Sequence, residues 1–284
     1  MLRIAVPNKG SLSERATTIL SEAGYRQRRD PKELVLVDAE NEVEFFYLRP
    51  RDIAVYVGSG DLDLGVTGRD LLLDSGADAV EVLPLGFGSS TFRFAARPGT
   101  VSTVRDLAGR RIATSYAGLV RSHLADHGVT AEVIRLDGAV ETAIRLGVAD
   151  VIADVVETGA TLRQQGLEIV AEPILRSEAV VIRGKGRSES GEDHRVDQLM
   201  RRINGVLVAR RYVMLAYDVE MARLDEAVAM TPGIEGPTIS PLHKEGWVAV
   251  QAMVPRDETN RIMDALYDLG ARAILVTSIH ACRL

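Results

Sequence analysis

The residues with the clearest capacity for chemistry lie in the segment 147–162. An apolar strand runs into a loop that contains one glycine and two threonines, and a helix is expected to follow. Backbone amides at such a loop and helix start converge on one anion, and Gly159 lets the backbone approach a phosphate closely. Thr158 and Thr161 would add hydroxyl donors. Asp154, at the carboxyl end of the strand, would accept from neighbouring hydroxyls, so a sugar phosphate would satisfy both halves of the site.

A purely structural role for these residues is an open alternative. Short loops of glycine and threonine are common, and this one could simply cap the helix that follows, with Asp154 stabilising the helix start. The residue types alone leave both interpretations open.

Repeated strand and helix patterns would position these side chains. Residues 2–6 are typical of a short buried strand that stops at Pro7, and a helix opens after Gly10. A second unit has a helix that starts at Pro50 and a strand at 62–66. Such repeats imply a mostly parallel sheet, in which ligands bind at the carboxyl ends of the strands.

A second α/β series follows a crossing between two lobes, which the glycines near residues 83–94 indicate. Its expected strands are at 112–114, 133–136, 150–154 and 179–182. The resulting division is lobe I at 1–93, lobe II at 94–183, and a polar connection with a basic helix at 184–211 that returns to lobe I.

The remaining residues, 212–284, show the element order βαββαβ. Two amphipathic helices and a central hairpin are typical of a self-contained ferredoxin-like domain.

Composition limits the class of protein. The 284 residues carry a formal net charge of −6, which argues against sequence-independent nucleic-acid binding, and no apolar run is long enough for a membrane span. One cysteine, Cys282, permits neither an intrachain disulfide nor a zinc motif, so we expect a cytoplasmic protein.

His123 and His127 could share a metal, but the sequence offers no evident third ligand.

The segment around the threonine loop resembles the signature of the ATP phosphoribosyltransferases. The matching positions are Glu141, Gly147, Ala149, Ile152, Asp154, Val155, Thr158, Gly159, Ala160, Thr161 and Leu162. Segments 6–10, 48–53, 65–70 and 107–114 agree in order, so the resemblance covers the whole chain. Residues 212–284 resemble the regulatory domain of the long form.

The resemblance implies a fold and a reaction. The fold would be α/β, with two catalytic lobes like those of type 2 periplasmic binding proteins and a C-terminal ferredoxin-like regulatory domain. The reaction, the first of histidine biosynthesis, joins ATP through adenine N1 to phosphoribosyl pyrophosphate, giving phosphoribosyl-ATP and pyrophosphate with Mg²⁺. Because adenine N1 has an available lone pair, positioning and electrostatics should supply most of the acceleration, without a dedicated catalytic nucleophile.

The resemblance also assigns residues to the phosphoribosyl site. Asp154 would face the ribose hydroxyls, and the 5′-phosphate would be held by Glu157, Thr158, Gly159, Ala160 and Thr161. The side chain of Glu157 should point outward, because a carboxylate is unfavourable beside a phosphate. Ala153 stands where related loops have a second acid, so Mg²⁺ would be held largely by pyrophosphate oxygens and water.

Cations and nucleotide contacts are expected on lobe I. Lys9 and Arg49 join Asp154 as candidate catalytic residues that contact the polyphosphates. The candidate nucleotide contacts are Arg69, Asp70, Leu71 and Ser90. For the cations the alternative is solvated surface charge, and for Asp70 it is a cap on the helix that begins there.

Regulation and assembly are further implications of the resemblance. Histidine would bind the terminal domain at Asp218, Thr238 and Ala273, although Asp218 could instead cap a helix and Thr238 could lie in a plain turn. The family implies AMP-type inhibitors and dimers that exchange with hexamers, but no nucleic-acid or membrane partner. Two other functions stay open: a non-catalytic two-lobed ligand-binding protein, and a phosphoribosyltransferase for another base.

Overall fold

The computed structural model describes residues 1–156, 159–186 and 194–283. The chain divides into two compact units, one of residues 1–18 and 26–195 and one of residues 19–25 and 196–284. Among the helices described, none is both long enough and apolar enough to cross a membrane.

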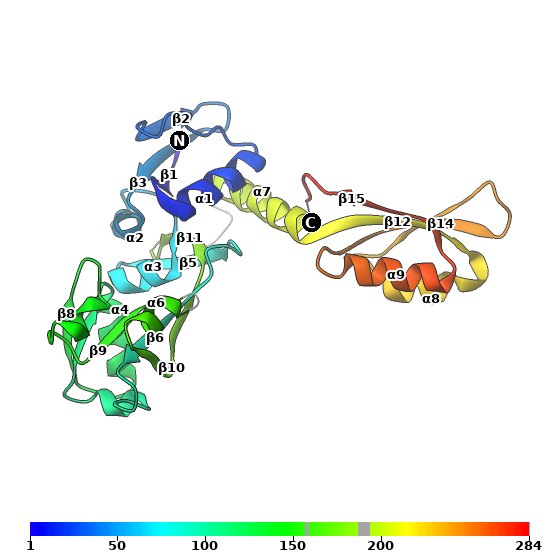
Figure 1. Ribbon diagram of the computed structural model, residues 1–284. Coiled ribbons are helices and arrows are strands. Elements are labelled where there is room, and N and C mark those ends of the chain that lie inside the picture. The colour runs from blue at the N-terminus through cyan, green and yellow to red at the C-terminus, as the bar shows by residue number, and fades with distance from the viewer. Residues whose placement is uncertain (157–158, 187–193, 284) are drawn as a thin grey trace. The chain divides into compact units, whose positions relative to one another are not determined.

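The first unit contains two α/β lobes, each built on one sheet (Figure 1). The lobe I sheet has the order β2-β3-β1-β4-β11-β5. Its strands are β1 Leu2–Pro7, β2 Val35–Asp38, β3 Val43–Leu48, β4 Leu64–Gly68, β5 Ala79–Pro84 and β11 Ala179–Gly184. Since β1 pairs in parallel with β3 and β4, the carboxyl ends of these three strands share one edge, as predicted.

Three helices belong to the sequence of lobe I: α1 Gly10–Glu22, α2 Pro50–Gly58 and α3 Arg69–Ser75. Helix α2 begins with proline at its first turn, where the missing N–H costs nothing. Its buried residues Ile53 and Val57 pack with Ala5, Val180 and Ile182 of the sheet. This packing fixes the strand ends from which the candidate site residues emerge.

The lobe II sheet has the order β10-β6-β9-β7-β8. Its strands are β6 Ser90–Ala96, β7 Arg111–Thr114, β8 Glu132–Arg135, β9 Val151–Val156 and β10 Glu168–Ser177. The helical segments are η1 Val104–Leu107, α4 Ala117–Asp126, α5 Thr142–Arg145 and α6 Ala160–Gln164. Val151 and Ala153 pack into one apolar cluster and Ile152 into another, so β9 is covered on both faces. That explains its continuous apolar sequence.

The chain crosses between the lobes twice, and the crossings lie side by side. Residues 85–89 connect β5 to β6, and Glu178 alone separates β10 from β11. The Leu85 amide donates to the Ala179 carbonyl at 2.9 Å, and the Ala179 amide donates to the Phe87 carbonyl at 2.8 Å. The Gly86 amide donates to the Glu178 carboxylate at 2.9 Å.

The lobe boundaries therefore differ from the predicted 1–93 and 94–183. Strand β6 begins at Ser90, already in lobe II, and β11 pairs with β4 and β5 of lobe I. The prediction missed this because an apolar run identifies a strand without identifying the distant strands that pair with it.

Helix α7, His194–Arg211, was predicted to return to lobe I. From Val196 onward it belongs to the same compact unit as residues 19–25, which include the end of the lobe I helix α1. The Arg210 guanidinium pairs with Glu22 at 2.9 Å, and that of Arg202 lies 5.1 Å from the Tyr25 ring centre. The basic side chains of α7 thus bind the segment 19–25.

The rest of the second unit has the predicted βαββαβ order, which confirms the ferredoxin-like domain. Its elements are β12 Tyr212–Glu220, η2 Met221–Arg223, α8 Leu224–Met230, β13 Thr238–Pro241, β14 Trp247–Pro255, α9 Thr259–Leu269 and β15 Arg272–Ser278. The antiparallel sheet has the order β13-β14-β12-β15. Leu215 and Tyr217 of β12 pack against Leu266 of α9, and a buried hydrogen bond of 2.8 Å joins the hydroxyls of Tyr217 and Thr231.

His123, in the last turn of α4, and the following C-cap residue His127 should make the stability of lobe II depend on pH. His123 Nε2 is buried without a hydrogen-bond partner in the described structure, and burial, with the nearby charge of His127, lowers the pKa of His123 below 6.5. The unfolded chain therefore takes up a proton at a higher pH than the folded chain, and stability falls as pH drops below about 6.5. We expect His123→Phe to reduce this fall in the melting temperature between pH 7 and pH 5. An unchanged pH profile would contradict the assignment.

Candidate functional site

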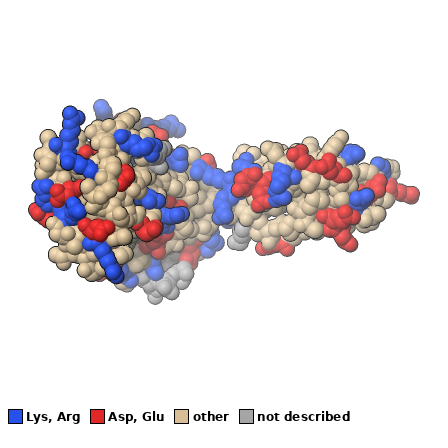
Figure 2. Space-filling model, turned by 60° about the horizontal axis from the view of Figure 1, so that its bottom comes forward, with Lys and Arg blue, Asp and Glu red and all other residues tan. Residues whose placement is uncertain are grey.

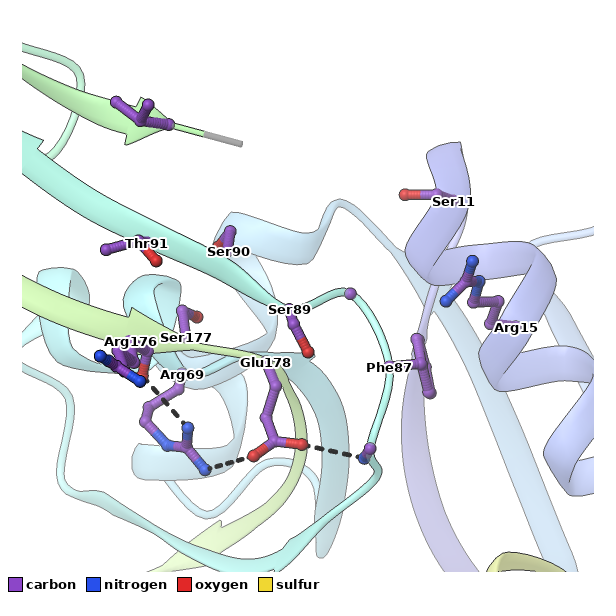
Figure 3. Close-up of a pocket in the computed structure, with 13 residues that line it drawn as sticks. Ser11, Arg15, Arg69, Phe87, Ser89, Ser90, Thr91, Arg176, Ser177 and Glu178 are labelled. Atoms are coloured by element: carbon purple, nitrogen blue, oxygen red, sulfur yellow. Dashed lines mark hydrogen bonds and ion pairs between the residues drawn. The ribbon is translucent and has the colours of Figure 1, made fainter. Parts of the chain in front are cut away.

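A polar cavity of about 830 Å³ lies where the chain passes between the lobes (Figure 3). One wall comes from α1 and the others come from the first crossing and from the ends of β9 and β10. Its polar lining consists chiefly of three arginines and five hydroxyl groups, those of Arg15, Arg69, Arg176, Ser11, Ser89, Ser90, Thr91 and Ser177. Guanidinium and hydroxyl donors in this number suit a ligand with several phosphate oxygens.

Strand register places the cavity beside the predicted phosphoribosyl loop. Val156, the last residue of β9, lies opposite Thr91 of β6, and Thr91 lies opposite Arg176 of β10. Ser90, a predicted nucleotide contact, precedes Thr91 and also lines the cavity. The last residue of β9 and these donors therefore share one end of the lobe II sheet.

The three arginines are in different electrostatic states. Arg69 donates to both carboxylate oxygens of Glu81 at 2.7 Å. It also pairs with Glu178 at 3.2 Å (Figure 3). Glu81 and then Glu178 hold the pKa of Arg69 above the ordinary value. Two carboxylates thus offset the charge of a residue that was predicted to contact the nucleotide. Arg15 and Arg176 have no ion-pair partner in the described part of the chain, and their charges are available to a ligand.

Asp154 lies on β9 near its carboxyl end, as predicted. Burial raises the pKa of its carboxyl, and the charge of Glu141 raises it further, although the Val155 amide donates to it at 2.8 Å. Glu141 belongs to the matched signature and precedes α5, so a second acid approaches Asp154 from outside the loop. The half-buried carboxylate retains acceptor capacity that ribose hydroxyls could use.

The loop itself is described only in part. Gly159 precedes α6 with φ of 67°, in the left-handed region that favours glycine, and Ala160 and Thr161 open that helix. Glu157 and Thr158 lie outside the described residues, as does the expectation that Glu157 points outward.

Asp70 and Leu71, two of the predicted nucleotide contacts, are buried on α3. The Ser177 hydroxyl donates to the Asp70 carboxylate at 2.9 Å, and the Asp70 amide donates to the Ser177 hydroxyl at 3.0 Å. The first turn of α3 is capped by the Ser177 hydroxyl, which accepts from the Asp70 amide, so the capping role considered for the Asp70 side chain is wrong. That side chain instead ties the helix to the end of β10.

Tyr116, between β7 and α4, lies beside the same carboxylates. Burial, followed by the charge of Asp70, raises the pKa of its hydroxyl above the ordinary value, with a smaller contribution from Asp154. The phenol therefore stays protonated and can donate at neutral pH.

Lys9 and Arg49 lie at one edge of lobe I. They follow β1 and β3, whose last residues Pro7 and Leu48 are opposite each other, and both side chains are exposed. Neither lines the cavity. Within the described ranges neither has an ion-pair partner, so the structure leaves both cations available at the edge of the sheet.

The charged residues elsewhere do not form one broad positive face in the view of Figure 2, where Lys and Arg are interspersed with Asp and Glu. Recognition of an anion on this face would then depend on individually placed groups.

The predicted histidine contacts are divided between two places in the terminal sheet. Asp218 of β12 lies opposite Arg272, next to Ala273, whose φ of 50° accompanies a register shift between the two strands. Thr238 belongs to β13, which β14 separates from β12. Asp218 and Ala273 are therefore neighbours, whereas Thr238 is two strands from Asp218.

The sequence interpretation missed Arg15, Arg176 and Tyr116 and gave Glu141 no role. Nothing in the sequence distinguishes Arg15, on the helix expected after Gly10, from a solvated surface arginine. Arg176 gave no signal either, because it reaches the site only through the pairing of β10 with β6.

Comparison with known proteins identifies the family. The model of the ATP phosphoribosyltransferase family matches residues 49–205, and that of its C-terminal domain matches residues 209–281. ATP phosphoribosyltransferases of Streptomyces avermitilis and Streptomyces coelicolor are 68% and 66% identical to this chain, each over the full length of both chains.

A solved structure agrees with this comparison. A chain of the ATP phosphoribosyl transferase (HisG:HisZ) complex from Thermotoga maritima superposes with a TM-score of 0.61 and 26% identity, covering 72% of this chain and 99% of that one. With the signature around Asp154, the two lobes and the ferredoxin-like domain all in place, the chain belongs to the long-form ATP phosphoribosyltransferases.

Proposed function

We propose that the two-lobed unit binds phosphoribosyl pyrophosphate at the end of β9 and ATP across the adjacent cavity, and joins adenine N1 to the ribose with loss of pyrophosphate. The observation that carries this arrangement is the row of Val156, Thr91 and Arg176 across three paired strands. This row supports the proposal because it brings hydroxyl donors and an unpaired guanidinium to the end of β9.

The chemistry asks little of a general base. Adenine N1 attacks the anomeric carbon with its own lone pair, the bond from that carbon to pyrophosphate breaks, and the pyrophosphate oxygen takes the electron pair. The protein must therefore align two anionic substrates, ATP and phosphoribosyl pyrophosphate. It must also supply hydrogen-bond donors for the negative charge that develops on pyrophosphate. Asp154 would orient the ribose through its hydroxyls, and Arg15, Arg176, Lys9 and Arg49 would provide positive charge.

Magnesium fits this site as an ion that enters with its substrate. The described residues include no cluster of three or more His, Cys, Asp or Glu side chains able to hold a metal. Asp154, near the end of β9, would offer Mg²⁺ one carboxylate contact, and pyrophosphate oxygens and water would be the other ligands. The ion would neutralise charge on pyrophosphate.

A direct assay tests the reaction. The protein is mixed with ATP, phosphoribosyl pyrophosphate and Mg²⁺, and phosphoribosyl-ATP is followed by ultraviolet absorbance with pyrophosphatase present. Binding without turnover would favour a non-catalytic receptor. Faster turnover with adenine, guanine or orotate than with ATP would favour a phosphoribosyltransferase for another base.

We further propose that histidine binds the terminal domain and that the enzyme, a cytoplasmic one, forms dimers and hexamers. Asp218→Ala should raise the histidine concentration for half inhibition by about tenfold or more, because a carboxylate that meets an ammonium or imidazolium contributes roughly 1.5–3 kcal/mol. Uninhibited turnover should stay the same.

The matched control for Asp218 is Asp225→Ala, which removes the same charge from an exposed position on α8. Inhibition curves with and without histidine measure both variants. If Asp218→Ala and Asp225→Ala are inhibited like the wild type, Asp218 is not part of the effector site.

A further inference from the structure

The first turn of α4, in lobe II, is capped by a side chain from lobe I. Helix α4 begins at Ala117, and its N-cap residue Tyr116 makes no side-chain capping hydrogen bond. Instead, the amides of Gly118 and Leu119 donate to one carboxylate oxygen of Asp74, on α3, at 2.8 and 3.1 Å. A function usually performed by a residue just before the helix is thus performed by the opposite lobe.

The same carboxylate is held from a second direction. Arg51, on α2, donates to its other oxygen at 2.7 Å, and the Asp74 side chain is only 11% exposed. The Arg51 guanidinium also lies 4.8 Å from the centre of the Tyr116 ring. One acid therefore fastens two lobe I helices and the start of a lobe II helix.

Gly118 allows the close approach on which this contact depends. A Cβ added there would overlap the Asp74 carbonyl oxygen, so any side chain would push α3 and α4 apart. The backbone at Gly118 does not require glycine, because its φ is not in the left-handed range. The glycine therefore serves the contact between the lobes.

The contact is also close to the candidate site. Asp70 and Asp74 are one helical turn apart on α3, and the Tyr116 hydroxyl is influenced by the charges of Asp70 and Asp154. A shift of α4 relative to α3 would move Tyr116 away from these carboxylates.

We propose that Asp74 is a positioning residue, which caps α4 across the lobe boundary and so sets the alignment of the phosphoribosyl site in lobe II with lobe I. Together with Arg51 and Gly118 it forms a third connection between the lobes, in addition to the two chain crossings. The consequence for catalysis rests on the proposed function, whereas the connection itself can be tested without turnover.

The main test is Asp74→Ala in the full chain, with Asp78→Ala as the matched control. Asp78 is an acid of the same lobe with a side chain 80% exposed. Loss of Asp74 should speed hydrogen exchange of the amides at the start of α4 and lower kcat by about tenfold, because small misplacement of two reactants is costly. The Kd of phosphoribosyl pyrophosphate alone should change less than kcat, because Asp154 and the end of β9 lie within lobe II. Asp78→Ala should behave like the wild type.

A second variant, Gly118→Ala, tests the contact from the other lobe and keeps the acid. Alanine favours a helix more than glycine does, so helix propensity alone predicts slower exchange. Faster exchange in α4 with a lower kcat would instead show that the lobes are held apart. This variant decides the question if Asp74→Ala does not fold.

The proposal would be overturned if whichever of Asp74→Ala and Gly118→Ala folds shows the wild-type rate of hydrogen exchange in α4 and the wild-type kcat. It would also be overturned if Asp78→Ala lost as much kcat as Asp74→Ala. A lower melting temperature with unchanged kcat at 25 °C would also overturn it, because Asp74 would then act only on folding. If the wild-type enzyme itself shows no turnover, the proposed function fails, and hydrogen exchange still decides whether Asp74 connects the lobes.

Discussion

Replacing Asp154 with asparagine should lower kcat by about 100-fold, the order of loss expected when a reacting centre is held in the wrong place. Asparagine has nearly the same shape but lacks the negative charge, and it brings an amide donor to ribose hydroxyls that need an acceptor. The variant should be no less stable than the wild type, since burial already penalises the ionised form of Asp154. Steady-state kinetics and thermal unfolding of the same preparation measure both effects.

The pH profile provides an independent check on Asp154. Because burial, reinforced by Glu141, raises the pKa of its carboxyl above 3.8, the ionised form disappears at a higher pH than for an exposed aspartate. Wild-type kcat/KM should therefore fall as pH is lowered through this raised pKa, and the residual activity of Asp154→Asn should not show that fall.

The control for Asp154 is Asp137→Asn, in the same lobe, whose side chain is 95% exposed. It should leave kcat and its pH profile unchanged. Wild-type kinetics for Asp154→Asn would remove Asp154 from the active site.

Removing the charge of either unpaired arginine of the cavity, Arg15 or Arg176, should weaken substrate binding strongly. Arg15→Gln and Arg176→Gln should each raise the KM of at least one polyphosphate substrate by about 10- to 100-fold, because a charge-assisted hydrogen bond contributes roughly 1.5–3 kcal/mol. Neither arginine has an ion-pair partner among the described residues, so neither substitution leaves a carboxylate unpaired. Stability should change little.

The two KM values, measured by varying ATP and phosphoribosyl pyrophosphate separately, would assign each arginine to a substrate. Arg105→Gln is the control, since Arg105 is an exposed arginine of the same lobe as Arg176 and lies outside the cavity. Unaltered KM values in both Arg15→Gln and Arg176→Gln would show that the cavity does not hold the polyphosphates.

Local sequence patterns predicted where helices and strands occur better than they predicted which strands pair with one another. The proline at position 50 indicated the start of α2, and the apolar run before Asp154 indicated β9, because both signals are contained within a few residues. Strand β10 was not predicted, since Pro173 and a register shift between Val170 and Leu175 interrupt its alternation. A bulge of this kind destroys the period on which the prediction depends.

The same distinction applies to the site. Asp154 could be predicted because its strand and loop are consecutive in the sequence. The pairing of Arg69 with Glu81 and Glu178 could not, because those acids are 12 and 109 residues away and only the packed sheet brings them together. A basic residue near a predicted cleft can therefore be an internal counter-ion.

The two adjacent crossings between the lobes limit how the cavity can change. The two crossings by themselves allow one inexpensive rotation of the lobes, about the line that joins them, and the third connection, from Asp74 to the amides of Gly118 and Leu119, restrains that rotation further. Hydrogen bonds from Leu85, Gly86 and Ala179 hold the crossings side by side and so define that axis. Groups on the axis, such as Glu178 and its partner Arg69, would move least, while groups far from it would travel furthest as the lobes rotate. Arg69, whose charge Glu81 and Glu178 offset, should therefore keep its position as the lobes rotate. The unpaired cations Arg15 and Arg176 would move relative to it and approach a bound substrate.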